Sequence, residues 1–163
     1  MRTKIARLAL AVCACATISA CQHDAAGKSG WIRGDSHERW TTVGRHLRGL
    51  DVAMVEIGYR YQELYWAGVD SNWEYANYQV RKIDLALEDA LERRPKRRAS
   101  AETMFVSALE EVKQAIMLKE RAAFEQAFEG MSAACNSCHA AEGVASFHVE
   151  PPTDRKSPIR APR

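Results

Sequence analysis

Apolar side chains recur at alternating spacings of three and four residues through most of this 163-residue chain. That spacing keeps them on one face of an α-helix, so it predicts amphipathic helices that must bury this face against one another. Residues 41–143 contain a single proline, Pro95, and no stretch of them alternates as a strand would. We therefore expect an all-α domain over residues 41–143.

Four such stripes follow one another along this region. They are separated by turn signals at residues 67–71, at Pro95 and near residues 118–120, and Gly143 is well placed to end the last helix. Four amphipathic helices with short connections predict an antiparallel up-down-up-down bundle. The positions that define the stripes are Val43, Leu47, Leu50, Met54, Ile57, Tyr61 and Leu64; Trp73, Ala76, Val80, Ile83, Leu87 and Ala90; Phe105, Ala108 or Leu109, Val112 and Ile116; and Phe124, Phe128, Met131, Cys135 and Cys138.

The first twenty residues are organised like an export signal. A basic start is followed by an uninterrupted apolar run over residues 8–20. The run is shorter than the roughly 20 apolar residues that span a bilayer, so we expect a cleaved signal peptide over residues 1–20. It ends in "ISAC", which resembles a bacterial lipobox with Cys21 as the lipidated residue. The alternative is ordinary cleavage that leaves Cys21 as a free exported thiol.

This N-terminus predicts a location in the cell envelope. The protein is expected in the periplasm of a Gram-negative bacterium, held to the inner or outer membrane by a lipid on Cys21. Residues 21–40, which are polar and contain glycine, are expected to be a tether. The tail, residues 144–163, is rich in proline and basic residues and is expected to be extended or disordered.

Charge argues against nucleic acid as a partner. The whole chain has 23 Lys and Arg against 21 Asp and Glu, and three of its basic residues, Arg2, Lys4 and Arg7, belong to the expected signal. Without them the opposite charges nearly balance, so the net charge argues against nucleic acid as the main partner.

A C-x-x-C-H motif, "CNSCH", lies at the end of the fourth stripe. On a helix the spacing of Cys135, Cys138 and His139 turns all three side chains toward one side. C-x-x-C-H is the signature of haem c attachment, in which two thiols form thioethers with the porphyrin vinyl groups and the adjacent imidazole binds the iron. We therefore expect one covalent haem c, with His139 as its proximal ligand.

Two other kinds of site use paired cysteines. A redox dithiol is typically placed at the N-terminus of a helix that follows a strand, whereas this motif is near a helix C-terminus. Structural zinc needs four ligands, and no second Cys/His cluster lies nearby in the sequence. A haem-free bundle closed by a Cys135–Cys138 disulfide remains the alternative of a different class.

With "CNSCH" on the last of four helical stripes, the chain resembles the class II cytochromes c, which include cytochrome c′. The resemblance implies a four-helix bundle in which the first helix supplies the residue on the distal side of the iron. A methionine there makes an electron carrier, and an apolar residue leaves the iron open to a small gas. Met54 is on the first stripe at a suitable height, so it is a candidate distal ligand; ordinary packing is the alternative. The tail after Gly143 departs from the family pattern.

These observations predict haem-dependent electron transfer in the cell envelope, with gas binding or sensing by five-coordinate haem as the alternative. We expect no enzymatic turnover, because no nucleophile–base pair and no second metal cluster is evident. The basic run Arg93–Arg98 is either a solvated turn or a docking patch for an acidic redox partner or anionic lipid headgroups. A homodimer is also kept among the expected assemblies.

Overall fold

The computed structural model describes residues 30–161 of the chain. These residues fold into helices joined by short connections, and no β-strand occurs among them. The expectation of an all-α protein is therefore confirmed. The expected signal peptide, Cys21 and the first part of the expected tether lie outside the described residues.

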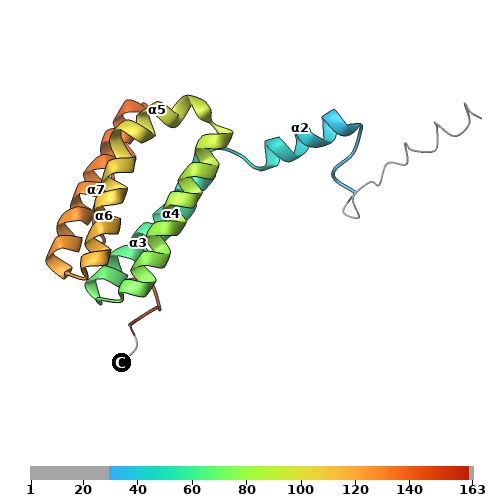
Figure 1. The fold of residues 1–163 in the computed structure, drawn as a ribbon. Helices are drawn as coiled ribbons and strands as arrows, with labels where there is room; N and C mark the ends of the chain where they lie inside the picture. Colours follow the sequence, from blue (N-terminus) through green and yellow to red (C-terminus); the bar gives the residue numbers. More distant parts are fainter. Residues whose placement is uncertain (1–29, 162–163) are drawn as a thin grey trace, which may run out of the picture. The chain divides into compact units, whose positions relative to one another are not determined.

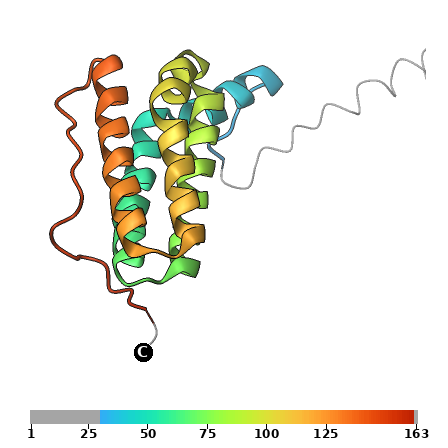
Figure 2. The ribbon, with the colours of Figure 1, turned by 60° about the vertical axis from the view of Figure 1, so that its left-hand side comes forward.

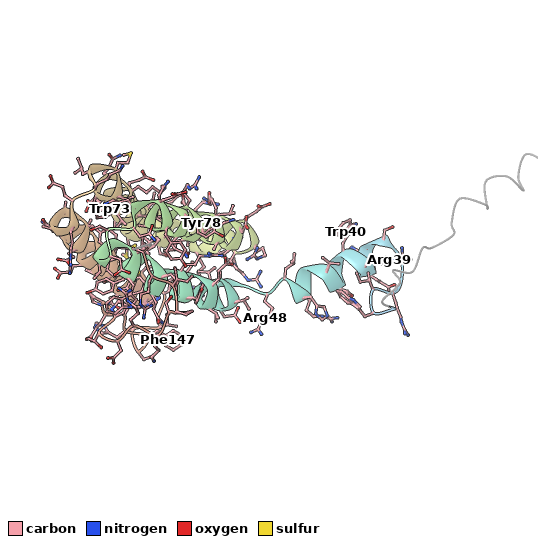
Figure 3. The ribbon with its side chains drawn as sticks, turned by 90° about the horizontal axis from the view of Figure 1, so that it is seen from below. Arg39, Trp40, Arg48, Trp73, Tyr78 and Phe147 are labelled. Carbon is pink, nitrogen blue, oxygen red and sulfur yellow. The ribbon has the colours of Figure 1, made fainter. Side chains whose placement is uncertain are left out.

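A separate helix, α2 (Ser36–His46), precedes the bundle. Asp35 caps it reciprocally: its carboxylate accepts from the Glu38 backbone N–H, and the Glu38 carboxylate accepts from the Asp35 N–H. Trp40 projects from this helix and is 74% exposed (Figure 3). The contacts within the chain divide it after Leu47 into two compact units, of which α2 belongs to the first.

The expectation of one continuous helical stripe from Val43 to Leu64 was wrong. Arg48 has a φ of 56°, which is left-handed, and Gly49 is extended, so the helical path stops there and a new helix begins at Leu50. Asp51 stabilises this start, because its carboxylate pairs with Arg48 and accepts from the Gly49 N–H at 3.2 Å. The glycine's low helix propensity is the local reason for the break.

The second unit is a helical bundle with packed helix pairs (Figure 1). Helix α3 packs on α4 and α7, and α6 packs on α4 and α7. The expected breaks are confirmed: α4 ends two residues before Pro95, and Lys119, with a φ of 57°, separates α6 from α7. The elements are α3 (Leu50–Val69), α4 (Trp73–Arg93), the 3₁₀ turn η2 (Pro95–Arg97), α5 (Arg98–Ala101), the π-helical segment η3 (Glu102–Val106), α6 (Ser107–Leu118) and α7 (Arg121–Ala141).

Two contacts fix the antiparallel register of α3 and α7. Gly68 lies against the Phe124 ring so closely that an added Cβ would come within 2.0 Å of it. About two turns away on each helix, the Tyr61 hydroxyl and the Ser132 hydroxyl are hydrogen-bonded at 2.7 Å, and both residues are buried. Moving backward along α3 therefore corresponds to moving forward along α7.

The core differs in composition between the two ends of the bundle. Near the α3–α4 connection it consists largely of aromatic rings in contact with one another, with centroids 4.5 to 6.1 Å apart: Tyr61, Tyr65, Trp73, Phe124 and Phe128. At the opposite end several buried positions are alanines, including Ala53, Ala90 and Ala101. Large side chains therefore supply most of the burial energy at the first end, each contributing about 1.5–3 kcal/mol.

The C-terminal strap, residues 144–161, runs back along α7 without helix or strand (Figure 2). It is not free of the bundle, as a disordered tail would be. Arg155 makes two hydrogen bonds of 2.6 Å to the Asp70 carboxylate, and its guanidinium lies 4.6 Å from the centre of the Trp66 ring. Ser157 donates to the buried Glu63 carboxylate at 2.8 Å.

We expect the end of the strap to detach at acid pH. Hydrogen bonds from Arg155 hold the pKa of Asp70 below its ordinary value. A carboxyl group whose folded-state pKa is depressed stabilises the folded state above its unfolded pKa, and that stabilisation is lost as the pH falls below about 4. The indole N–H resonance of Trp66 should shift in this range as Arg155 leaves it. An Asp70→Asn variant should show no such acid transition, and persistence of the shift in that variant would contradict the assignment.

Candidate functional site

The two cysteines of the motif lie on consecutive turns of α7, close to its C-terminal end. Cys135 is half-buried and packs against the edge of the core, and Cys138 is also half-buried. Burial raises the pKa of the Cys135 thiol to about 12. Burial also raises the pKa of Cys138, although the positive charge of Arg97 acts in the opposite direction. The two cysteines form no disulfide, and neither has the lowered thiol pKa that is typical of a redox dithiol.

His139 follows on the same helix, and its ring orientation is set by the strap. Its Nδ1 lies 2.5 Å from the backbone carbonyl oxygen of Phe147. A carbonyl can only accept, so Nδ1 carries the hydrogen and donates it, which leaves the lone pair on Nε2. This arrangement is typical of histidines that bind a metal through Nε2.

The end of α7 explains how Phe147 reaches His139. Gly143 adopts a φ of 76°, and the Val144 N–H donates to the His139 carbonyl at 2.8 Å while the Gly143 N–H donates to the Ala140 carbonyl at 3.1 Å. These are the two bonds of a Schellman motif, which ends a helix and reverses the chain. Gly143 was expected from the sequence as the helix stop, and this is confirmed.

A second contact joins the motif to the strap. Asn136, which stands between the two cysteines, donates through Nδ2 to the Val149 carbonyl and accepts through Oδ1 from the Val149 N–H, both at 2.8 Å. Val149 itself is half-buried against the core. The peptide groups of the strap are therefore held next to the motif rather than in solvent.

The basic run after α4 also meets the end of α7. Arg97 and the Ser100 hydroxyl both contact the Glu142 carboxylate. Arg98 pairs with Glu88 at 3.1 Å and with Glu102, four residues further along the chain, at 3.3 Å. Two of the five basic residues of Arg93–Arg98 are thus engaged within the chain, which reduces the positive charge offered to a partner.

Met54 lies at the same level of the bundle as the end of the motif. Seven residues back from Tyr61 on α3 is Met54, and seven residues forward from its partner Ser132 on α7 is His139. Both steps are about 10.5 Å along the helix axis. Met54 is half-buried and packs against the core, so the structure places it on the inner side of α3.

These residues fit a covalently attached haem. The motif presents two thiols on one side of α7 and an imidazole whose Nε2 is available, which is the donor set that haem c requires. The buried positions near this end include the alanines Ala53, Ala90 and Ala101, together with the larger side chains of Leu91 and Phe105.

The sequence did not reveal the contributions of Asn136, Phe147 and Val149. Phe147 and Val149 contribute backbone groups, and the Asn136 side chain bonds to the backbone of Val149. No pattern of side chains in the sequence identifies such contacts. The available signal was Gly143, which predicts a chain reversal at the point where the strap begins.

Comparisons of the chain with protein-family models, with curated protein sequences and with solved structures found no match.

In residues 30–161 no three His, Cys, Asp or Glu side chains cluster as ligands of a metal ion would. Over the same range no helix is long and apolar enough to cross a bilayer.

Proposed function

We propose that this chain is a c-type cytochrome, similar to the class II cytochromes c, that transfers electrons in the cell envelope. The finer fold in this proposal is an up-down-up-down four-helix bundle with one haem c on its last helix. The observation that carries it is the bond from His139 Nδ1 to the Phe147 carbonyl beside the paired thiols, since it leaves Nε2 for iron.

Each residue of the motif has a distinct part in the proposal. Cys135 and Cys138 hold the haem through thioethers, His139 is the proximal ligand, and Met54 is the distal ligand. When bound, the haem supplies one-electron redox chemistry. The protein's part is to orient His139 through the strap, to exclude water with the apolar side chains of α3 and α7, and to hold the thiols on one side of the helix.

The proposed location rests on the N-terminal segment, and the proposed partner rests on the basic run after α4. We infer a lipid anchor on Cys21 that holds the protein to the periplasmic face of the inner or outer membrane. Arg93, Arg94 and Lys96 of the basic run are the cations offered to an acidic redox partner, since Arg97 and Arg98 are engaged within the chain. A homodimer is compatible with this arrangement.

The alternative is a gas-binding or sensing protein with five-coordinate haem. Met54 is favoured as a ligand by its level relative to His139 and by its position at the edge of the core. If Met54 instead serves only for packing, the distal side of the iron is open to a small gas. The proximal residues are the same in both functions, so the distal residue decides between them.

We expect Met54→Ala to convert a low-spin spectrum into a high-spin one that responds to carbon monoxide. The reason is that loss of the thioether sulfur removes the sixth ligand of the iron. The measurement is the absorption spectrum of the reduced protein before and after addition of carbon monoxide. Met117→Ala is a matched control, because Met117 is 64% exposed on α6 and should leave the spectrum unchanged. A wild-type spectrum in Met54→Ala would remove Met54 from the iron.

A further inference from the structure

The strap is fastened to the motif at a residue that haem attachment itself does not use. Asn136 is one of the two variable residues of "CNSCH", and both polar atoms of its side chain bond to the backbone of Val149 at 2.8 Å. The Asn136 amide thus bonds to both the N–H and the carbonyl of Val149, as a backbone peptide group in a neighbouring strand would. Two bonds to one residue fix both the position and the orientation of that part of the strap. Its neighbour Ser137 bonds only to the Ala133 carbonyl of its own helix.

The two hydrogen bonds between Asn136 and Val149, here called the Asn136 clamp, lie two residues along the strap from the Phe147 carbonyl that accepts from His139. The Schellman turn at Gly143 holds one end of the short segment 144–149, and Asn136 holds the other. Between them, the Phe147 N–H donates to the Val144 carbonyl at 2.9 Å. Because both ends and the middle of segment 144–149 are hydrogen-bonded, the segment has little conformational freedom. The Phe147 carbonyl is therefore confined to the position in which it accepts from His139 Nδ1.

The Phe147 side chain is not what holds this segment. Its ring is 64% exposed and lies at the surface of the unit (Figure 3), with its centroid 6.5 Å from that of His139. Val149, by contrast, packs against the core. The farther bonds of Arg155 and Ser157 hold the rest of the strap to α3 and the α3–α4 turn.

We propose that Asn136 is a positioning residue for His139. By holding Val149, it keeps the Phe147 carbonyl on Nδ1 and so maintains the tautomer and ring orientation that present Nε2. This inference rests on the proposed function, because the consequence of the orientation is read at the iron. An acceptor on the remote nitrogen makes imidazole a stronger electron donor and therefore favours ferric iron.

The test uses the full chain produced in a host that matures cytochromes c. Asn136→Ala should raise the amide hydrogen-exchange rate of residues 144–150 by about tenfold, since it removes two hydrogen bonds. It should also shift the reduction potential of the haem to a more positive value. Ser137→Ala, the neighbouring variant in the same motif, should change neither. Arg155→Ala should speed exchange only at the far end of the strap and leave the potential unchanged.

A second variant removes one of the hydrogen bonds between Asn136 and Val149 by a change in the strap. Val149→Pro removes the N–H that Asn136 accepts and leaves α7 intact, so it should reproduce both effects even if Asn136→Ala fails to fold. A released strap with an unchanged potential would overturn the inference, and so would unchanged exchange in both variants. These outcomes are distinct from failure of the proposed function, which would appear as wild-type protein without covalent haem.

Discussion

Replacement of Cys135 and Cys138 together by alanine should abolish covalent attachment of haem. Both thiols lie on one side of α7, and thioether formation needs at least one of them. The measurement is the intact mass of the protein, together with haem staining after denaturing electrophoresis, for wild type and variant matured in the same host. The variant should have the mass of the polypeptide and its lipid without haem, and its stain should be lost completely.

The single variants and a neighbouring substitution sharpen this result. Cys135→Ala and Cys138→Ala each keep one thiol, so each should retain part of the haem through one thioether. Ser137→Ala lies between the cysteines, is exposed and bonds only within α7, so it should retain full staining. Equal haem content in the double variant and the wild type would show that the cysteines do not hold the cofactor.

Phe124→Ala should remove about 3–5 kcal/mol from the free energy of unfolding. The Phe124 side chain is fully buried, lies against Gly68, and contacts the rings of Trp73 and Phe128 with centroids 6.1 and 5.7 Å away. Its loss leaves a cavity between α3 and α7 that the neighbouring rings cannot fill without moving. A cost of this size is a large fraction of the roughly 5–15 kcal/mol by which native domains are stable. Denaturant unfolding followed by circular dichroism measures it.

Phe147→Ala is the matched control for this change. The same atoms are removed, but from a ring that is 64% exposed on the strap, so unfolding should change by less than about 0.5 kcal/mol. Similar losses in the two variants would mean that the aromatic cluster at the α3–α4 end does not dominate the stability of the bundle.

The parts of the fold that could be predicted from the sequence are those that depend on local signals. The periodic apolar positions of α4 and α7, the stop before Pro95 and the helix end at Gly143 all follow from side-chain period or backbone preference. The break at Arg48 was missed because the apolar period continues through it. The departure there is in the backbone, where Arg48 is left-handed and Gly49 extended.

The candidate site divides in the same way. Cys135, Cys138 and His139 were recognisable because their types and spacing carry the chemistry. The contacts that orient His139 were not, since Phe147 contributes a backbone carbonyl and Asn136 contributes an amide that bonds to another backbone. The tail was expected to be extended or disordered from its proline and charge content, and that content gave no sign that Arg155 would bond to Asp70, 85 positions away in the chain. Such long-range pairs leave no local pattern.

The absorption spectrum of the purified wild-type protein, matured in a host that makes cytochromes c, tests the central claim most directly. We predict a haem c spectrum that stays with the polypeptide through acid–acetone extraction, with the sharp α and β bands of low-spin iron after reduction. A colourless protein with the mass of the polypeptide and its lipid alone would contradict the assignment of Cys135, Cys138 and His139 to haem.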